Sequence, residues 1–109
     1  MYTTLEHFLK YVTYDTQSDE EAGRAGKVPS TDTQWELARE MERELNERGF
    51  KDVSVSEYCY VMGTLPANTD RKIPAIGFIT HMDTAAEASG KNVKARVVKN
   101  YDGGDVVLN

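Results

Sequence analysis

His81 and Asp83 are the residues of this sequence whose types and spacing could most readily do chemistry. Residues two apart in extended backbone point to the same side, so this imidazole and this carboxylate would lie together. Such a pair suits a metal ligand and the group that supports it. A lone His-x-Asp pair is a weak signal, because a histidine at the end of a strand is more often structural. From the pair alone, both interpretations stay open.

The segment before this pair indicates how it would be positioned. Residues 75–80 are mostly apolar, follow Pro74 and end in a polar cluster, which is typical of a buried strand. We therefore predict a strand over 73–80. In an open α/β sheet, functional residues gather just beyond the carboxyl ends of such strands. The predicted strand would place His81 and Asp83 at such an end, next to a small-residue loop that begins at Thr84.

A first helix is predicted to begin near Thr3, which would cap it, with Glu6 completing a capping box. Apolar residues at helical spacing define one face of this helix: Leu5, Phe8, Leu9 and Val12. His7 and Lys10 fall outside that face, so we expect them to be solvated. Residues 13–30 then read as a polar loop, whose acidic run at 19–21 we expect to be solvated surface.

A second helix is the clearest element of the pattern. Ser30 or Thr31 would cap its start, and Gly49 would end it. Its apolar stripe, which we interpret as core, comprises Trp35, Ala38, Met41 and Leu45. Its opposite, polar face comprises Glu36, Glu40, Arg43, Glu44, Glu47 and Arg48.

Four strands are predicted after the second helix, over 53–56, 60–65, 73–80 and 94–99. Gly63 would allow a close approach or a bulge in the second of them. An apolar strand such as 73–80 normally needs cover on both faces, and two helices could cover one. We therefore predict an α/β fold, two helices followed by several strands, that forms the opening portion of a larger domain.

The bulk properties narrow the class of protein. The chain has 109 residues and a net charge of −5, which argues against a general nucleic-acid binder. Its single cysteine, Cys59, implies no internal disulfide, and we expect a small buried or half-buried side chain there. We see no signal peptide and no apolar stretch near the roughly 18 residues of a membrane span. These features predict a cytoplasmic location, with neither nucleic acid nor membrane as partner.

Residues 77–84, Gly-Phe-Ile-Thr-His-Met-Asp-Thr, resemble the first metal-ligand motif of the M20 family of zinc peptidases. Within that family, the match is to the tripeptide aminopeptidases. Further segments support the resemblance in the right order along almost the whole chain: 15–18, 28–31, 64–68, 89–93 and 100–105. Many ordered segments together are far more specific than the His-x-Asp pair alone.

The resemblance implies roles for individual residues. His81 would ligate one of two zinc ions, and Asp83 would be the catalytic-site carboxylate that orients a ligand and tunes its basicity. The family's paired metals activate a water that attacks a peptide carbonyl, and a glutamate acts as general base. The substrate would be a tripeptide, which loses its N-terminal residue.

The family's other metal ligands, its general base and its lid and dimerisation domain have no match in this sequence. Residues 1–109 would therefore be the N-terminal portion of a mixed-sheet catalytic domain, inactive on its own. One alternative is a non-catalytic module that forms a homo-oligomer through unpaired strand edges. A weaker alternative is a stand-alone metal-binding protein that uses His81, Asp83 and a partner chain.

Overall fold

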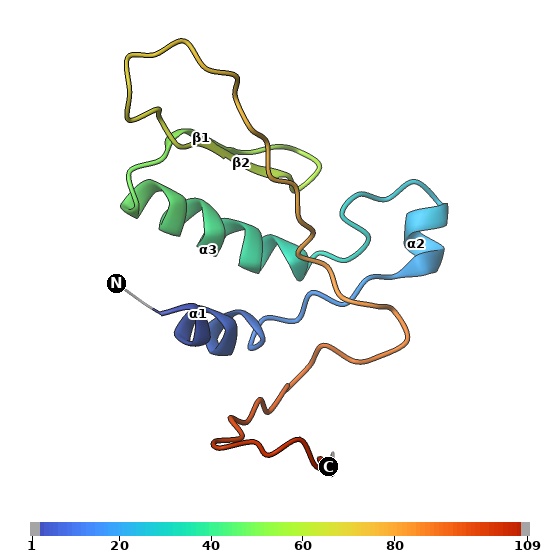
Figure 1. Ribbon diagram of the computed structural model, residues 1–109. Coiled ribbons are helices and arrows are strands. Elements are labelled where there is room, and N and C mark those ends of the chain that lie inside the picture. Colours follow the sequence, from blue (N-terminus) through green and yellow to red (C-terminus); the bar gives the residue numbers. More distant parts are fainter. Residues whose placement is uncertain (1–2, 108–109) are drawn as a thin grey trace.

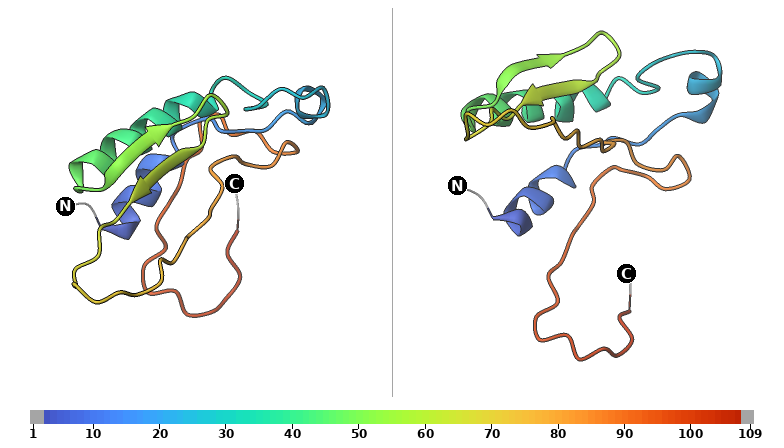
Figure 2. Two further views of the ribbon diagram at one scale, coloured as in Figure 1. Left: turned by 90° about the horizontal axis from the view of Figure 1, so that it is seen from above. Right: turned by 45° about the horizontal axis from the view of Figure 1, so that its top comes forward.

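The computed structural model describes residues 3–107. Three helices precede a two-stranded antiparallel sheet, which confirms the α/β class (Figure 1). The elements are α1 (Thr4–Tyr11), α2 (Glu20–Arg24), α3 (Gln34–Glu47), β1 (Lys51–Val55) and β2 (Val61–Thr64). Helix α3 lies between the hairpin and α1, and the chain beyond β2 runs on as extended coil (Figures 1 and 2). Among residues 3–107, no helix has the length and apolar character required to cross a membrane.

The start of α1 is as predicted. The Glu6 N–H donates to Thr3 Oγ1 at 3.2 Å, and the Thr3 N–H donates to Glu6 Oε2 at 2.5 Å. This reciprocal capping box satisfies two of the N–H groups that a helix leaves unpaired at its start.

The prediction that His7 and Lys10 are solvated is wrong. Both face α3, where Lys10 Nζ lies 2.7 Å from Glu44 Oε1 and His7 Nδ1 lies 3.2 Å from Glu44 Oε2. The Tyr11 hydroxyl donates to the same carboxylate at 2.5 Å. Leu5 and Phe8, on the predicted apolar face, are instead exposed. Helical spacing identifies an apolar face, but the neighbouring element decides which face is covered.

Residues 13–30 are not all loop, because they contain the short helix α2, whose N-cap is Asp19. Its side chain accepts a hydrogen bond from the Ala22 N–H at 2.9 Å, as an N-cap residue does. The predicted solvation of the acidic run is confirmed, since residues 19–21 are all exposed.

Helix α3 ends as predicted but begins later. Its N-cap is Thr33, because the predicted caps have other partners: Ser30 Oγ accepts from the Asp19 N–H at 3.0 Å, and the Thr31 hydroxyl donates to the Gln17 carbonyl at 2.8 Å. Gly49 adopts a φ of 81°, the left-handed conformation that ends many helices.

The core involves α3 and the hairpin of β1 and β2, which pack against each other. Its buried apolar residues among those described are Leu37, Ala38 and Cys59. Leu37 lay outside the predicted stripe, and Glu44, predicted on the polar face, is buried against α1. Burial of Cys59 is as expected, and it raises the pKa of the thiol. A raised thiol pKa disfavours the nucleophilic thiolate form, which agrees with a packing role.

The hairpin of β1 and β2 confirms the first two predicted strands. Its register pairs Lys51 with Thr64 and Ser54 with Met62, so β1 holds one residue more than β2 between these pairs. This bulge lies opposite Gly63, where a Cβ would approach side chains of α3 and β1 to 3.4 Å. The predicted close approach at Gly63 is therefore confirmed.

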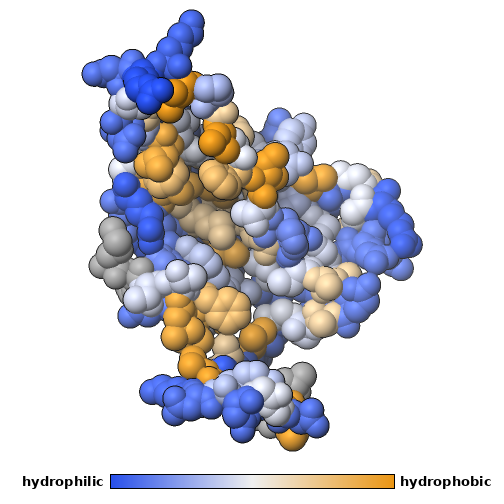
Figure 3. All heavy atoms as spheres, viewed as in Figure 1, coloured by the Kyte–Doolittle hydropathy of each residue, from blue (hydrophilic) through white to orange (hydrophobic). Residues whose placement is uncertain are grey.

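The predicted strands at 73–80 and 94–99 do not form. Both segments run as exposed coil, and Phe78 and Ile79 are 95% and 101% exposed. A strand is stable only where neighbouring backbone accepts its hydrogen bonds, and neither segment pairs with another part of residues 3–107. Figure 3 shows apolar side chains open to solvent on the viewed face of the molecule.

Candidate functional site

The structure brings His81 and Asp83 together, as their spacing predicts. His81 Nδ1 lies 2.9 Å from the Asp83 carbonyl oxygen and 3.1 Å from Asp83 Oδ1. Both neighbours are acceptors, so Nδ1 is the nitrogen that carries the proton in the neutral ring. The lone pair then lies on Nε2 of a side chain that is 83% exposed. This is the tautomer that a metal-binding histidine adopts when a carboxylate holds its other nitrogen.

The second oxygen of the Asp83 carboxylate has a partner distant in sequence. Ser18 Oγ donates a hydrogen bond to Asp83 Oδ2 at 2.6 Å. This bond is the main reason that the pKa of the Asp83 carboxyl lies below its usual range, and His81 lowers the pKa further. Asp83 is therefore an ionised acceptor at neutral pH.

A backbone bridge holds the segment that carries this carboxylate. Gln17 and Thr84 pair in parallel, with the Thr84 N–H donating to the Thr16 carbonyl at 2.9 Å. The Ser18 N–H donates to the Thr84 carbonyl at 3.0 Å, and Gln17 Nε2 donates to the Ala86 carbonyl at 2.7 Å. Residues 16–18 therefore fix the chain just after His81 and Asp83.

Gly90 adds a second contact between the same two segments. A Cβ at Gly90 would lie 2.6 Å from Asp15 Oδ1, so no larger residue fits without displacement. In Figure 1 the segment that leads to α2 lies beside the orange segment, as the pairing of Gln17 with Thr84 requires. Three of the motif segments noted in the sequence, 15–18, 28–31 and 89–93, thus converge around the site. Sequence reasoning noted these segments but missed Ser18 as a partner of Asp83.

A shallow groove borders the site on the side of α2. Ser18 links the two, because it contacts Asp83 and also lines the groove. The residues that line the groove are Asp15, Gln17, Ser18, Asp19, Glu20, Glu21, Thr31, Thr33, Ala86 and Lys91. Four carboxylates against one lysine make it acidic.

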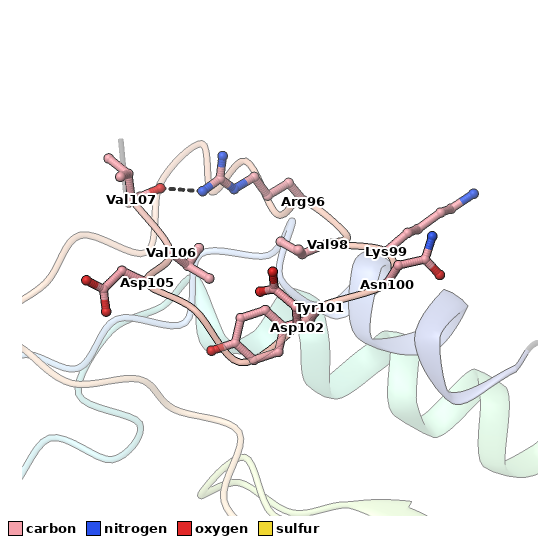
Figure 4. A pocket seen from close by; sticks show the side chains of 9 residues that line it. All are labelled: Arg96, Val98, Lys99, Asn100, Tyr101, Asp102, Asp105, Val106 and Val107. Atoms are coloured by element: carbon pink, nitrogen blue, oxygen red, sulfur yellow. Dashed lines mark hydrogen bonds between the residues drawn. The ribbon is translucent and has the colours of Figure 1, made fainter.

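A second hollow lies along residues 96–107, and neither His81 nor Asp83 lines it (Figure 4). The Arg96 guanidinium donates to the Val107 carbonyl across it. The chain bends here at Gly103, which has a φ of 90°, and the Gly104 N–H donates to Asp102 Oδ1 at 3.1 Å. These contacts fold the coil locally and add no group to the site.

The Nε2 of the exposed His81 side chain is suited to bind a metal, but only together with ligands from other residues. In residues 3–107, no three side chains of His, Cys, Asp or Glu converge as a metal site would require. A catalytic zinc typically has about three protein ligands. His7, the other histidine, lies against Glu44 between α1 and α3. The described residues thus offer one imidazole that could ligate a metal, with a carboxylate beside it.

Comparison with known proteins finds that this chain is similar to one part of a longer protein. A peptidase T of Clostridium novyi (strain NT) is 52% identical over 109 residues, which are 100% of this chain and 26% of the relative. A peptidase T of Geobacillus thermodenitrificans (strain NG80-2) is 51% identical over 105 residues, 96% of this chain and 25% of the relative. The chain is homologous to a part of peptidase T.

This similarity agrees with the peptidase class that the motifs indicate. The chain spans about a quarter of the length of the curated peptidase T relatives that it matches. The match to the C. novyi peptidase T covers the whole chain, so it includes His81, Asp83 and the segments that converge on them. No protein-family model matches the chain.

Proposed function

We propose that this chain supplies part of the active site of a metal-dependent tripeptide aminopeptidase of the M20 family. The observation that supports this most directly is the orientation of His81, whose Nδ1 faces Asp83 and leaves Nε2 for a metal. The homology to peptidase T over all 109 residues supports the peptidase class. A tripeptide substrate follows from the family resemblance of the motifs.

We assign His81 Nε2 as a ligand of one of two zinc ions and Asp83 as the carboxylate that holds the ligand in place. An ionised Asp83 stabilises the Nδ1–H tautomer and makes Nε2 a better donor to a cation. When bound, zinc polarises a carbonyl and lowers the pKa of a water molecule, which suits peptide hydrolysis.

The chain alone is proposed to be inactive towards peptides. Residues 3–107 offer His81 but gather no set of ligands around it. The remaining ligands and the general base would come from parts of the enzyme that correspond to the other three quarters of peptidase T. A cytoplasmic location is part of the same proposal, and the single cysteine supports it.

A second candidate function is self-association without catalysis. Ile76, Phe78 and Ile79 form an exposed apolar segment of extended chain, and such unpaired backbone templates strand exchange. Light scattering separates this candidate from the first. A homo-oligomer that buries residues 76–79 would support it, and a monomer at all concentrations would contradict it.

A chimera tests the peptidase proposal. The stretch of C. novyi peptidase T that aligns with residues 1–109 is replaced by this chain, and release of the N-terminal residue from a tripeptide is measured. We expect the chimera to be active, the isolated chain to be inactive, and His81→Ala in the chimera to abolish activity. Lys72→Ala, an exposed residue outside the site, is the control. Full activity of the His81→Ala chimera would contradict the proposal.

A further inference from the structure

Ser18 reaches the site from a segment that precedes α2. Its hydroxyl donates to Asp83 Oδ2 at 2.6 Å, while Asp83 Oδ1 faces His81 Nδ1. We propose that Ser18 is a positioning residue, whose hydroxyl holds the Asp83 carboxylate in the orientation that supports His81. This inference rests on the proposed function, because it concerns how the same site is organised.

The backbone on both sides of Ser18 is held by hydrogen bonds. On one side, the Ser18 N–H is bonded to the Thr84 carbonyl at 3.0 Å. On the other, the Asp19 N–H donates to Ser30 Oγ at 3.0 Å, and the Asp19 side chain caps α2. The backbone that carries the hydroxyl is therefore held in place before the hydroxyl meets the carboxylate, which lowers the entropic cost of the hydrogen bond.

Asp83 needs such a restraint because it is not buried. Its side chain is 44% exposed, so water competes for both of its oxygens. The Asp83 main-chain carbonyl also accepts from His81 Nδ1, at 2.9 Å, and this contact does not depend on where the carboxylate points. Two acceptors thus stabilise the Nδ1–H tautomer of His81, the main-chain carbonyl and the carboxylate of Asp83. Ser18 bonds only to the carboxylate, so it affects only that contact.

This division of roles gives the experiment a specific readout. In the full 109-residue chain, NMR three-bond couplings report the χ1 rotamer populations of Asp83, and ring ¹⁵N shifts report the tautomer of His81. The variants are Ser18→Ala, Ser18→Thr, which keeps the hydroxyl, and Ser54→Ala, an exposed serine of β1, as control. We expect one dominant Asp83 rotamer in the wild type, Ser18→Thr and Ser54→Ala, and a mixture in Ser18→Ala. A single, unchanged rotamer in Ser18→Ala would overturn the inference.

Amide exchange separates positioning from a structural role. The Thr84 N–H, bonded to the Thr16 carbonyl, should keep its protection in Ser18→Ala, because the backbone bridge does not use the hydroxyl. Loss of that protection would mean that Ser18 holds the loop rather than the carboxylate, which overturns the inference. If Ser18→Ala does not fold, Ser18→Cys, of similar volume and with a weak donor, replaces it in both measurements.

Zinc binding to the chimera with C. novyi peptidase T, which supplies the remaining ligands, distinguishes this inference from the proposed function. The proposed function predicts that the chimera binds zinc and that His81→Ala weakens this binding, and equal zinc affinity in these two proteins would contradict that function whatever the Asp83 rotamers do. The inference predicts that Ser18→Ala in the chimera weakens zinc binding by about tenfold, as removal of such supporting groups does. Equal zinc affinity in the chimera with and without Ser18→Ala would overturn the inference and leave the proposed function standing.

Discussion

Gln17 and Thr84 pair as an isolated parallel bridge, in which the Thr84 N–H and carbonyl bond to the residues on either side of Gln17. This bridge joins the segment before α2 to the chain that follows His81 and Asp83. The site is therefore assembled from two distant parts of the sequence, although its two chemical groups lie next to each other.

Gly90→Ala should weaken the contact between the two segments. The new Cβ would lie 2.6 Å from Asp15 Oδ1 and 3.4 Å from the Gln17 backbone nitrogen, so the Asp15 carboxylate must shift away from it. Overpacking of this kind costs about 1–3 kcal/mol, and we expect faster amide exchange at Thr84. Gly77→Ala is the matched control, because a Cβ there meets nothing within 4 Å. Equal exchange rates at Thr84 in both variants would argue against the packing at Gly90.

Gly63→Val should destabilise the hairpin on α3. A Cβ at Gly63 already meets Leu45, Phe50 and Val53 at 3.4 Å, and the two further methyl groups have no room. We expect a loss of about 2 kcal/mol in the free energy of unfolding, measured by urea denaturation. Gly77→Val, at an open position, controls for the β-branched side chain, and a similar loss there would show that packing at Gly63 is not the cause.

Glu44→Gln should loosen α1 from α3. The Glu44 carboxylate is bonded to Lys10 and Tyr11 and is 8% exposed, so its loss leaves these partners poorly satisfied. Hydrogen bonds to buried charged groups contribute about 1.5–3 kcal/mol, and we expect a loss of that size in the free energy of unfolding. Glu47→Gln, which breaks an exposed ion pair with Arg43, should cost at most about 0.5 kcal/mol. An equal cost for both variants would contradict the burial of Glu44.

Stability should fall in acid through the same cluster. Hydrogen bonds from Arg43 and Lys10 lower the pKa of Glu40 to about 2, from an ordinary value of 4.5. Burial raises the pKa of Glu44, but hydrogen bonds from Lys10 and Tyr11 outweigh it, so this pKa is lowered as well.

Because both pKa values are lower in the folded state, the unfolded chain binds protons first as the pH falls. The stabilisation is present above pH 4.5 and is lost between about pH 4.5 and 2. Urea denaturation across this range should show the decline, and Glu40→Gln should make it shallower. An unchanged slope in Glu40→Gln would contradict this assignment.

The parts of the fold that the sequence could predict are those that depend on neighbours in the chain. The capping box of Thr3 and Glu6, the helix end at Gly49 and the hairpin around Gly63 all follow from local spacing. The approach of His81 to Asp83 is local in the same sense.

Contacts between distant segments could not be predicted in this way. The apolar run at 73–80 has the composition of a strand, yet it is coil because no backbone in residues 3–107 pairs with it. Likewise, nothing in the spacing of Lys10 or Ser18 shows that one meets Glu44 and the other Asp83. Each depends on how separate elements pack.

Metal content is the most direct measure of whether His81 is a metal ligand of a peptidase. The chimera of this chain with C. novyi peptidase T is purified with zinc, dialysed, and analysed by mass spectrometry alongside its His81→Ala variant. We predict about two zinc ions per chain in the chimera, as in a two-metal site, and at least one fewer in His81→Ala. Equal zinc content in the two proteins would contradict the account.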